Sequence, residues 1–355
     1  MNILVVNTGS TSTKMGLYDG DVPVFEKTLR HTVSDLASFK GVVDQYSFRT
    51  NILLDELKNS HVSAKDLACV VGIGGLLAPL EGGTYLVNQA MLEDLEKAKY
   101  GEHASNLGGI IAHTIAKETG IPAYIVDPVV VDEMEDIFRI SGHPLLPRRS
   151  IFHALNQKAI ARRYCSENGK NYNEVNLVVV HMGGGISVSL HSKGRVIDTN
   201  NALDGDGPFT PERSGSLPAG QLAQLCFSGE YAHEDVKELI KGKGGVVAYF
   251  GTNSMMDLEE AVAKGDPQAA MLMDAMALQV AKYIAAMAVG ACGNIDAILL
   301  TGGIARAKPL TDEITRRVGF VAPVCVYGGE DEISALALGA LRVLRGDEEA
   351  RVYGG

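Results

Sequence analysis

A repeated pattern of strand, glycine-rich turn and returning strand limits the fold most strongly. An apolar run, a tight turn and a second strand-like stretch occupy residues 3–18, and the same order returns at residues 177–190. Superposing Gly9 on Gly183 gives an offset of 174 in a chain of 355 residues. The repeat therefore predicts two related halves, each opening with a β-hairpin around a turn of phosphate size.

The rest of the chain alternates between helical and strand-like patterns. A third apolar run, residues 297–301, ends in Gly302 and Gly303 before a helix. Further strands are expected at 67–73 and 123–127, and helices at 34–58, 93–99, 104–118, 152–164, 256–264, 267–290 and 334–344. Alternating strands and helices predict an α/β fold with mixed sheets.

A domain boundary is expected near residues 144–149, which contain two prolines and a basic pair. It divides the chain into residues 1–149 and 150–333, and a C-terminal helix at about 334–349 can return to the first domain. The length suits two domains of ordinary size.

Charge excludes some classes of partner. The formal net charge is −11, so a nucleic-acid backbone or an anionic membrane surface is not expected to bind. A small anion can still bind, because backbone N–H groups at a turn matter more to it than net charge. The 40 glycines against 12 prolines point to tight turns and to backbone that approaches ligands, not to a flexible linker.

Cysteine use and the chain's apolar segments predict a cytoplasmic protein. The five cysteines are widely spaced, without a Cys-x-x-Cys pair, which favours reduced thiols over a disulfide framework or a zinc site. Residues 1–7 lack the basic region of a signal peptide. The long apolar stretch 277–291 contains Lys282 and Tyr283 and has the small residues of a buried helix, so no membrane span is expected.

Each repeated turn suits a phosphate group. Residues 7–14 place hydroxyls, free N–H groups and Lys14 together, although the Walker A pattern is absent. A Ser/Thr-rich hairpin turn is common in proteins that bind nothing there. The consecutive glycines 183–185 strengthen the functional interpretation, because they weaken a fold unless something must lie against that backbone.

Residues 200–215 form the densest candidate segment. Little of this stretch is expected in the core, and long loops of this kind are usually functional or disordered. Asp204 and Asp206 could hold calcium, but the further ligands of a calcium loop are missing. Arg213 could grip a phosphoryl group through two N–H groups, and a surface salt bridge is the alternative.

These elements together resemble the acetate, propionate and butyrate kinase family, and the butyrate kinases within it most. The resemblance extends over the whole chain and is carried by residues 102–106, 127–133, 150–156 and 204–215. It implies two duplicated actin-like, ribonuclease-H-like domains with mixed sheets around a nucleotide cleft. It also implies reversible ATP-dependent phosphorylation of a short-chain fatty acid to an acyl phosphate, with ATP/ADP and Mg²⁺ as cofactors, in a homodimer.

The resemblance also implies residue roles. The catalytic group consists of Arg213, His153, Asp127 and Lys14, and His103 lies beside the substrate. The nucleotide and its phosphates are bound by Asn7, Gly9, Ser10, Ser12, His181, Gly183, Gly184, Gly185, Gly302, Gly303 and Ile304. Mg²⁺ is linked to Asn7 and to Glu332, with Glu330 as the alternative register. His103 can instead be an ordinary residue at a helix N-terminus, and Asp127 an ordinary cap or turn residue.

The chain departs from the family pattern at one position. Residues 72–77 read Gly-Ile-Gly-Gly-Leu-Leu, with Ile73 where the family carries an arginine. Losing a charge-assisted contact predicts weak activity, unless Arg148 or Arg149 fills in or the change is isolated. The alternatives are another small-molecule kinase of this superfold, a nucleotide-dependent binding protein like the chaperone ATPases, and a chemically silent relative.

Overall fold

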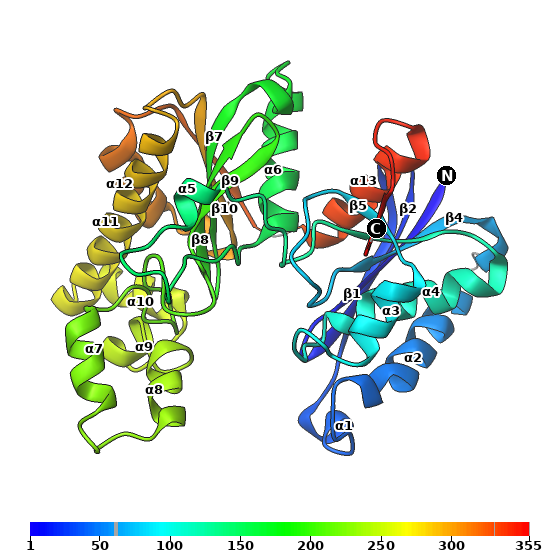
Figure 1. The fold of residues 1–355 in the computed structure, drawn as a ribbon, viewed down its shortest axis with the longest axis horizontal. Coiled ribbons are helices and arrows are strands. Elements are labelled where there is room, and N and C mark those ends of the chain that lie inside the picture. The colour runs from blue at the N-terminus through cyan, green and yellow to red at the C-terminus, as the bar shows by residue number, and fades with distance from the viewer. Residues whose placement is uncertain (60–62, 330, 355) are drawn as a thin grey trace. The chain divides into compact units, whose positions relative to one another are not determined.

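Two compact units make up the computed structural model, which describes all residues except 60–62, 330 and 355 (Figure 1). Unit 1 comprises Met1–Val131 with Asp331–Gly355, and unit 2 comprises Asp132–Glu330. Residues 132–149, expected in the first domain, belong to unit 2. Two ion pairs hold them there: the buried pair of Glu133 with Lys158 at 2.9 Å and the partly buried pair of Asp198 with Arg148 at 2.8 Å.

A seven-stranded mixed sheet forms the centre of unit 1. Its strand order is β12-β5-β6-β4-β1-β2-β3. The first hairpin pairs β1 and β2 antiparallel, β3 continues it, and β4 and β6 lie parallel on the other side of β1. The strand bounds are β1 Asn2–Thr8, β2 Ser12–Asp19, β3 Val22–Arg30, β4 Leu67–Ile73, β5 Thr84–Leu86, β6 Ala123–Val126 and β12 Arg351–Val352.

Helices α4 and α13 pack on the strands of this sheet. Helix α4 meets β4 where Gly72 and Gly108 let the two backbones approach, since a Cβ on either glycine would overlap the other element. The helical bounds in unit 1 are α1 Val33–Leu36, η1 Val43–Gln45, α2 Tyr46–Asn59, η2 Ala64–Asp66, α3 Gln89–Glu96, α4 Asn106–Thr119 and α13 Glu332–Arg345.

The single helix expected over residues 34–58 is wrong. Helix α1 ends at Leu36 and α2 begins at Tyr46. Between them, the N–H of Gly41 donates to the carboxylate of Asp44, at 3.0 Å. This local bond is an alternative to helical hydrogen bonding and interrupts the pattern.

Unit 2 repeats the strand arrangement of unit 1 with five strands. The order is β11-β10-β7-β8-β9, where β7, β8 and β9 form the antiparallel meander and β10 and β11 lie parallel on the other side of β7. The bounds are β7 Asn176–Met182, β8 Ile186–Ser192, β9 Arg195–Thr199, β10 Ala297–Gly302 and β11 Val324–Gly328. The expected duplication and mixed sheets are thus confirmed.

Alternating side chains bury both faces of this second sheet. Leu177 and Val179 pack in a core cluster with helix α6, whereas Val178 and Val180 belong to the larger cluster around α11. The helices of unit 2 are α5 Asp136–Arg139, α6 Ala154–Glu167, η3 Tyr172–Glu174, α7 Ala219–Cys226, α8 His233–Ile240, α9 Val246–Phe250, α10 Met255–Ala263, α11 Pro267–Gly290, η4 Gly303–Arg306 and α12 Lys308–Val318.

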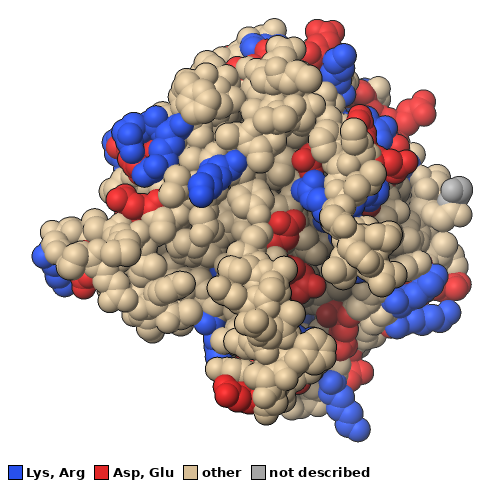
Figure 2. All heavy atoms as spheres, turned by 60° about the vertical axis from the view of Figure 1, so that its left-hand side comes forward, with Lys and Arg blue, Asp and Glu red and all other residues tan. Residues whose placement is uncertain are grey.

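Helix α11 alone, within the described part of the chain, is long and apolar enough to cross a membrane. Half of its most apolar window is buried, and Met276, Val280 and Ile284 lie fully in the core of unit 2. That burial is typical of a core helix. Figure 2 shows Lys and Arg side chains in small groups among Asp and Glu on the face drawn, without a continuous basic band.

Candidate functional site

The first turn joins β1 to β2, and five of the expected residues lie in or beside it: Asn7, Gly9, Ser10, Ser12 and Lys14. The N–H of Gly9 donates to the carbonyl of Ser12, at 2.9 Å, which closes the turn and leaves Ser10 exposed at its tip. Asn7 and Lys14 face each other across the hairpin. Both reach Glu332 of α13: Asn7 Nδ2 donates to Glu332 Oε2 at 2.7 Å, and Lys14 Nζ lies 3.9 Å from the same oxygen.

Glu332 is therefore the C-terminal acid that meets this turn among the described residues, and Glu330 lies outside them. The residue before it, Asp331, caps α13 by accepting a hydrogen bond from the N–H of Ser334. The cap sets where α13 begins, and so it positions Glu332 against β1.

Arg49 holds the first turn from behind, and the sequence did not single it out. Its side chain is fully buried on α2. The guanidinium donates to the carbonyls of Gly9 and Ser12 at 2.9 Å each and of Ser10 at 3.2 Å, and it is itself steadied by Gln45. Burial lowers the pKa of Arg49. The turn is thus built on a buried cation whose described partners are neutral oxygens.

Asp127 occupies a strained position at the end of β6. Its φ is 38°, in the left-handed region that non-glycine residues rarely adopt, and its side chain is buried. The carboxylate accepts a hydrogen bond from the N–H of Gly83 at 2.7 Å, and the Asp127 N–H donates to the Gly83 carbonyl at 3.0 Å. Backbone strain of this kind often occurs at functional sites.

His103 lies exposed just before α4. Its Nδ1 accepts from the N–H of Ser105 at 3.2 Å and lies 2.9 Å from the hydroxyl of the same residue. The Thr8 hydroxyl donates to the carbonyl of Ala104 at 2.7 Å. This bond ties the His103 segment to the end of β1, next to the first turn.

Ile73 ends β4, where it contacts α4. Its backbone and Cγ2 fill the space that a side chain at Gly108 would need. Arg148, suggested as a substitute for the missing arginine, is committed elsewhere: it donates to Asp198 at 2.8 Å and to the carbonyl of Thr199 at 2.9 Å. Arg149 is exposed and lines a hollow of about 550 Å³ in unit 2 together with Asp204 and Asp206.

The second turn, in unit 2, is closed by a bond from the N–H of Gly183 to the carbonyl of Gly185, at 3.0 Å. Thr210 donates to the carbonyl of Gly184 at 2.9 Å. The loop that contains Thr210 was expected outside the core, which is wrong: residues 207–211 are buried. Phe209 packs into the large cluster of unit 2, so the loop is anchored by its own apolar residues.

The third glycine turn follows β10. Gly302 has φ 91°, and a Cβ there would overlap the backbone of Met182 in β7, so only glycine fits. Around Gly303 there is open space, which a ligand could use. The side chain of Ile304 lies in the core, so only its backbone is placed to meet a nucleotide.

Two histidines stack beside the second turn. His153, at the start of α6, and His181, in β7, have ring centroids 3.8 Å apart and an interplanar angle of 12°. His181 Nδ1 contacts Asn156 Oδ1 at 2.8 Å. Burial, then the neighbouring His181 and Arg213, hold the pKa of His153 well below its usual value, so His153 is neutral near pH 7.

Arg213 completes this cluster in unit 2. A side chain at Gly185 would overlap its guanidinium, which therefore depends on glycine at that position. One nitrogen, Nη1, donates to the carbonyl of Ala202 at 2.6 Å, whereas the buried Nε has no hydrogen-bond partner among the residues that the structure describes. Burial lowers the pKa of Arg213. A buried donor without an acceptor is costly unless a ligand oxygen meets it.

Comparison with known proteins decides the family. Residues 140–320 match the model of the acetokinase family. Butyrate kinase 1 of Clostridium acetobutylicum is 55% identical over 99% of both chains, and butyrate kinase 2 of the same organism is 53% identical over 99% of both.

The chain belongs to the acetokinase family.

A solved acetate kinase has the same fold. The crystal structure of the acetate kinase of Porphyromonas gingivalis superposes with a TM-score of 0.78 over 97% of this chain and 99% of that chain, at 19% identity. The expected fold, two α/β domains of the actin-like class with mixed sheets, is thereby confirmed. Of the expected residues, Asn7, Lys14 and Glu332 meet in unit 1, and His153, His181, Gly185 and Arg213 meet in unit 2.

Proposed function

We propose that this acetokinase transfers the γ-phosphoryl group of ATP to the carboxylate of a short-chain fatty acid, with butyrate as the first candidate. The observation that carries the proposal is the identity of 55% and 53% to two butyrate kinases over nearly the whole chain. The products are an acyl phosphate and ADP. The reaction is reversible, because an acyl phosphate can phosphorylate ADP.

The chemistry needs no general base. A carboxylic acid with a reference pKa near 4 is already ionised at neutral pH. One carboxylate oxygen forms the new bond to the γ-phosphorus as the bond from that phosphorus to the β,γ-bridging oxygen breaks, and ADP leaves with the electron pair. What the protein must supply is the alignment of two anions and stabilisation of charge on the equatorial oxygens.

Arg213 and His153 are the groups in unit 2 that suit this task. The unpartnered Nε of Arg213 is a buried donor that a phosphoryl oxygen would satisfy. The stacked, neutral His153 adds a second donor without adding charge. The N–H groups of Gly184 and Gly185 and the open space at Gly303 suit the phosphates and nucleoside of ATP/ADP.

In unit 1, the first turn suits Mg²⁺ and phosphate. Asn7 and Glu332 offer the amide and carboxylate oxygens that Mg²⁺ accepts, and Lys14 offsets phosphate charge. The described residues contain no group of three or more acidic, histidine or cysteine side chains that could hold a metal. Asn7 and Glu332 therefore fit a Mg²⁺ whose other ligands are phosphate oxygens and water molecules. There the ion would neutralise charge that develops during transfer.

Asp127 and His103 have positioning roles in this proposal. The strained, buried Asp127 fixes the loop after β6 through Gly83. His103 presents an exposed ring from the segment tied to β1 by Thr8, which suits contact with the carboxylate substrate. The protein is expected to act in the cytoplasm. It is also expected to be a homodimer, and sedimentation equilibrium would test that oligomeric state.

A weakly active enzyme is the second candidate, favoured by one observation. Ile73 stands where the family carries an arginine, and Arg148 is held by Asp198 and Thr199. The acid with the highest rate can also be acetate, propionate or a branched acid. Rates with ADP and acyl phosphates of two to five carbons test both points: a clear preference for butyryl phosphate supports the proposal, and equal background rates for all would contradict it.

A further inference from the structure

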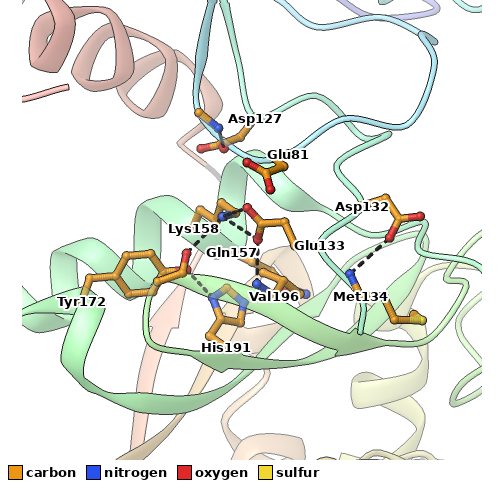
Figure 3. A network of polar contacts seen from close by, with 12 residues as sticks. Glu81, Asp127, Asp132, Glu133, Met134, Gln157, Lys158, Tyr172, His191 and Val196 are labelled. Carbon is orange, nitrogen blue, oxygen red and sulfur yellow. Dashed lines mark hydrogen bonds and ion pairs between the residues drawn. The ribbon is translucent and has the colours of Figure 1, made fainter. Parts of the chain in front are cut away.

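A chain of buried polar side chains leads from the far end of the sheet in unit 2 to His153. It consists of Tyr172, His191, Gln157 and Ser187, and none of the four was singled out from the sequence. Figure 3 shows Tyr172, His191 and Gln157 together, beside the buried pair of Lys158 and Glu133. Gln157, Ser187 and His191 are completely buried, so every proton in the chain needs an acceptor within it.

Gln157 sets the direction in which hydrogen bonds are donated along these side chains. Its Nε2 lies 3.1 Å from the carbonyl oxygen of Ser187 and 2.8 Å from the hydroxyl of the same residue. A carbonyl oxygen can only accept, so the side-chain atom that faces it is the amide nitrogen. Both amide protons of Gln157 are then used on Ser187, and the Ser187 hydroxyl acts as an acceptor from Gln157.

At one end, the hydrogen bonds donated from Gln157 lead through Ser187 to His153. The Ser187 hydroxyl accepts from Gln157, and also from the N–H of His153 at 3.4 Å, so its own proton needs an acceptor. The remaining contact of this hydroxyl is Nδ1 of His153, at 2.8 Å. Nδ1 must accept, and the single proton of the neutral ring therefore lies on Nε2. Within the described residues, Nε2 of His153 has no hydrogen-bond partner.

At the other end, the hydrogen bonds run in the same sense from Tyr172 through His191 to Gln157. Gln157 Oε1 lies 3.0 Å from Nε2 of His191, which must donate, and Nδ1 of His191 then accepts from the Tyr172 hydroxyl at 2.8 Å. Burial, then Lys158 and Arg162, hold the pKa of His191 well below its usual value, which keeps the ring neutral. Each link thus donates toward the next.

We propose that Tyr172, His191, Gln157 and Ser187 form a hydrogen-bond chain of fixed direction that positions His153 and keeps its proton on Nε2, where it donates to an oxygen of the migrating phosphoryl group. The proposal rests on the proposed kinase function for the identity of that acceptor. Ser187 and Gln157 are positioning residues, since they act through His153. A donor preset in this way needs no reorganisation during transfer.

Nitrogen-15 NMR of the full-length protein, labelled at histidine, tests the chain directly. The His153 signals are assigned by their loss in His153→Gln. In the wild type, both His153 and His191 should show an unprotonated Nδ1 and a protonated Nε2. In Gln157→Glu, the new carboxylate only accepts, so the Ser187 hydroxyl turns toward it. His153 should then carry its proton on Nδ1, and kcat should fall about tenfold or more with little change in KM for ATP.

Asn168→Asp is the matched control, because it places a carboxylate at the exposed end of the same helix. It should leave the His153 signals and kcat unchanged. A protonated Nδ1 of His153 in the wild type would overturn the proposal. So would a Gln157→Glu protein whose His153 signals and kcat match those of Asn168→Asp. If Gln157→Glu does not fold, Ser187→Ala provides a second test and should lower kcat. Its control is Ser189→Ala, which removes a buried hydroxyl that bonds to Thr199 instead. Equal kcat values for these two variants would overturn the proposal.

The NMR signals need no substrate. A protein that forms no acyl phosphate but shows the expected His153 and His191 protons would contradict the proposed function and leave the chain supported.

Discussion

Gly185 makes room for Arg213. The Cβ that any other residue would carry at position 185 would overlap the guanidinium of Arg213, which is held by the carbonyl of Ala202 beside the stacked rings of His153 and His181. The glycine-rich turn and the arginine from the 200–215 loop are therefore one structural unit. Neither motif alone indicates this dependence of Arg213 on a glycine at position 185.

Gly185→Ala should therefore displace Arg213 and lower kcat by roughly 10²-fold, the usual effect of losing one preset donor to a charged transition state. Steady-state kinetics with butyrate and ATP measure the change. Gly220→Ala is the control, because a Cβ at position 220 meets open space. A Gly185→Ala enzyme as active as the control would show that the guanidinium is not needed where the structure places it.

Arg49→Met should loosen the first turn. The substitution removes the donors to the carbonyls of Gly9, Ser10 and Ser12, and leaves these oxygens without their buried partner. The Ser12 carbonyl keeps its bond from the N–H of Gly9. A hydrogen bond to a charged group contributes about 1.5–3 kcal/mol, so the free energy of unfolding should fall by a few kcal/mol and KM for ATP should rise. Urea unfolding measures the first effect. Lys58→Met, exposed on the same helix, should change neither, and a matching result for Arg49→Met would contradict the role given to Arg49.

Sequence patterns predicted the central strands of both sheets, because these strands are local runs of apolar residues, but not the outer strands β3, β5, β9, β11 and β12. The strand at 67–73 and the helix at 267–290 have the expected bounds, and the repeat at 3–18 and 177–190 corresponds to the two hairpins. The helix expected over 34–58 failed because the bond from Gly41 to Asp44 is a local alternative that apolar spacing does not show.

The candidate site was only partly visible in the sequence. Gly9, Gly185 and Arg213 carry recognisable chemistry, but Arg49 sits at a core position of α2, one face with Leu53 and Leu57. A charged residue at a core position was the available signal. Ser187 and Gln157 had none, because their importance comes from a pairing across 30 residues that only the fold creates.

Ile73→Arg should raise kcat/KM for the carboxylate substrate by roughly tenfold, if the isoleucine removes a charge-assisted contact. Initial rates at subsaturating butyrate measure this. Ile73→Val is the control for disturbance of the packing against Gly108, and it should leave the rate near that of the wild type. No gain with arginine would show that the departure at this position has no catalytic consequence.

The stability should depend on His191 in acid. Burial lowers the pKa of His191 in the folded state. Below a pH of about 6.5, His191 therefore binds a proton in the unfolded chain but not in the folded protein. Its contribution is present above that pH and is lost as the pH falls, by up to about 1.4 kcal/mol per pH unit. Urea unfolding of the wild type and His191→Gln at several pH values should show a shallower acid slope in the variant. Parallel slopes would contradict a neutral, buried His191.

Hydroxylamine trapping of the acyl phosphate tests the central proposal most directly. The protein is incubated with butyrate, ATP and Mg²⁺, and the hydroxamate is measured over time. We expect hydroxamate that requires all three reactants, and formation lowered by orders of magnitude in Arg213→Ala, whose buried Nε donor would be lost. No hydroxamate from any acid between acetate and the branched five-carbon acids, with folded protein, would contradict the assignment of a carboxylate kinase.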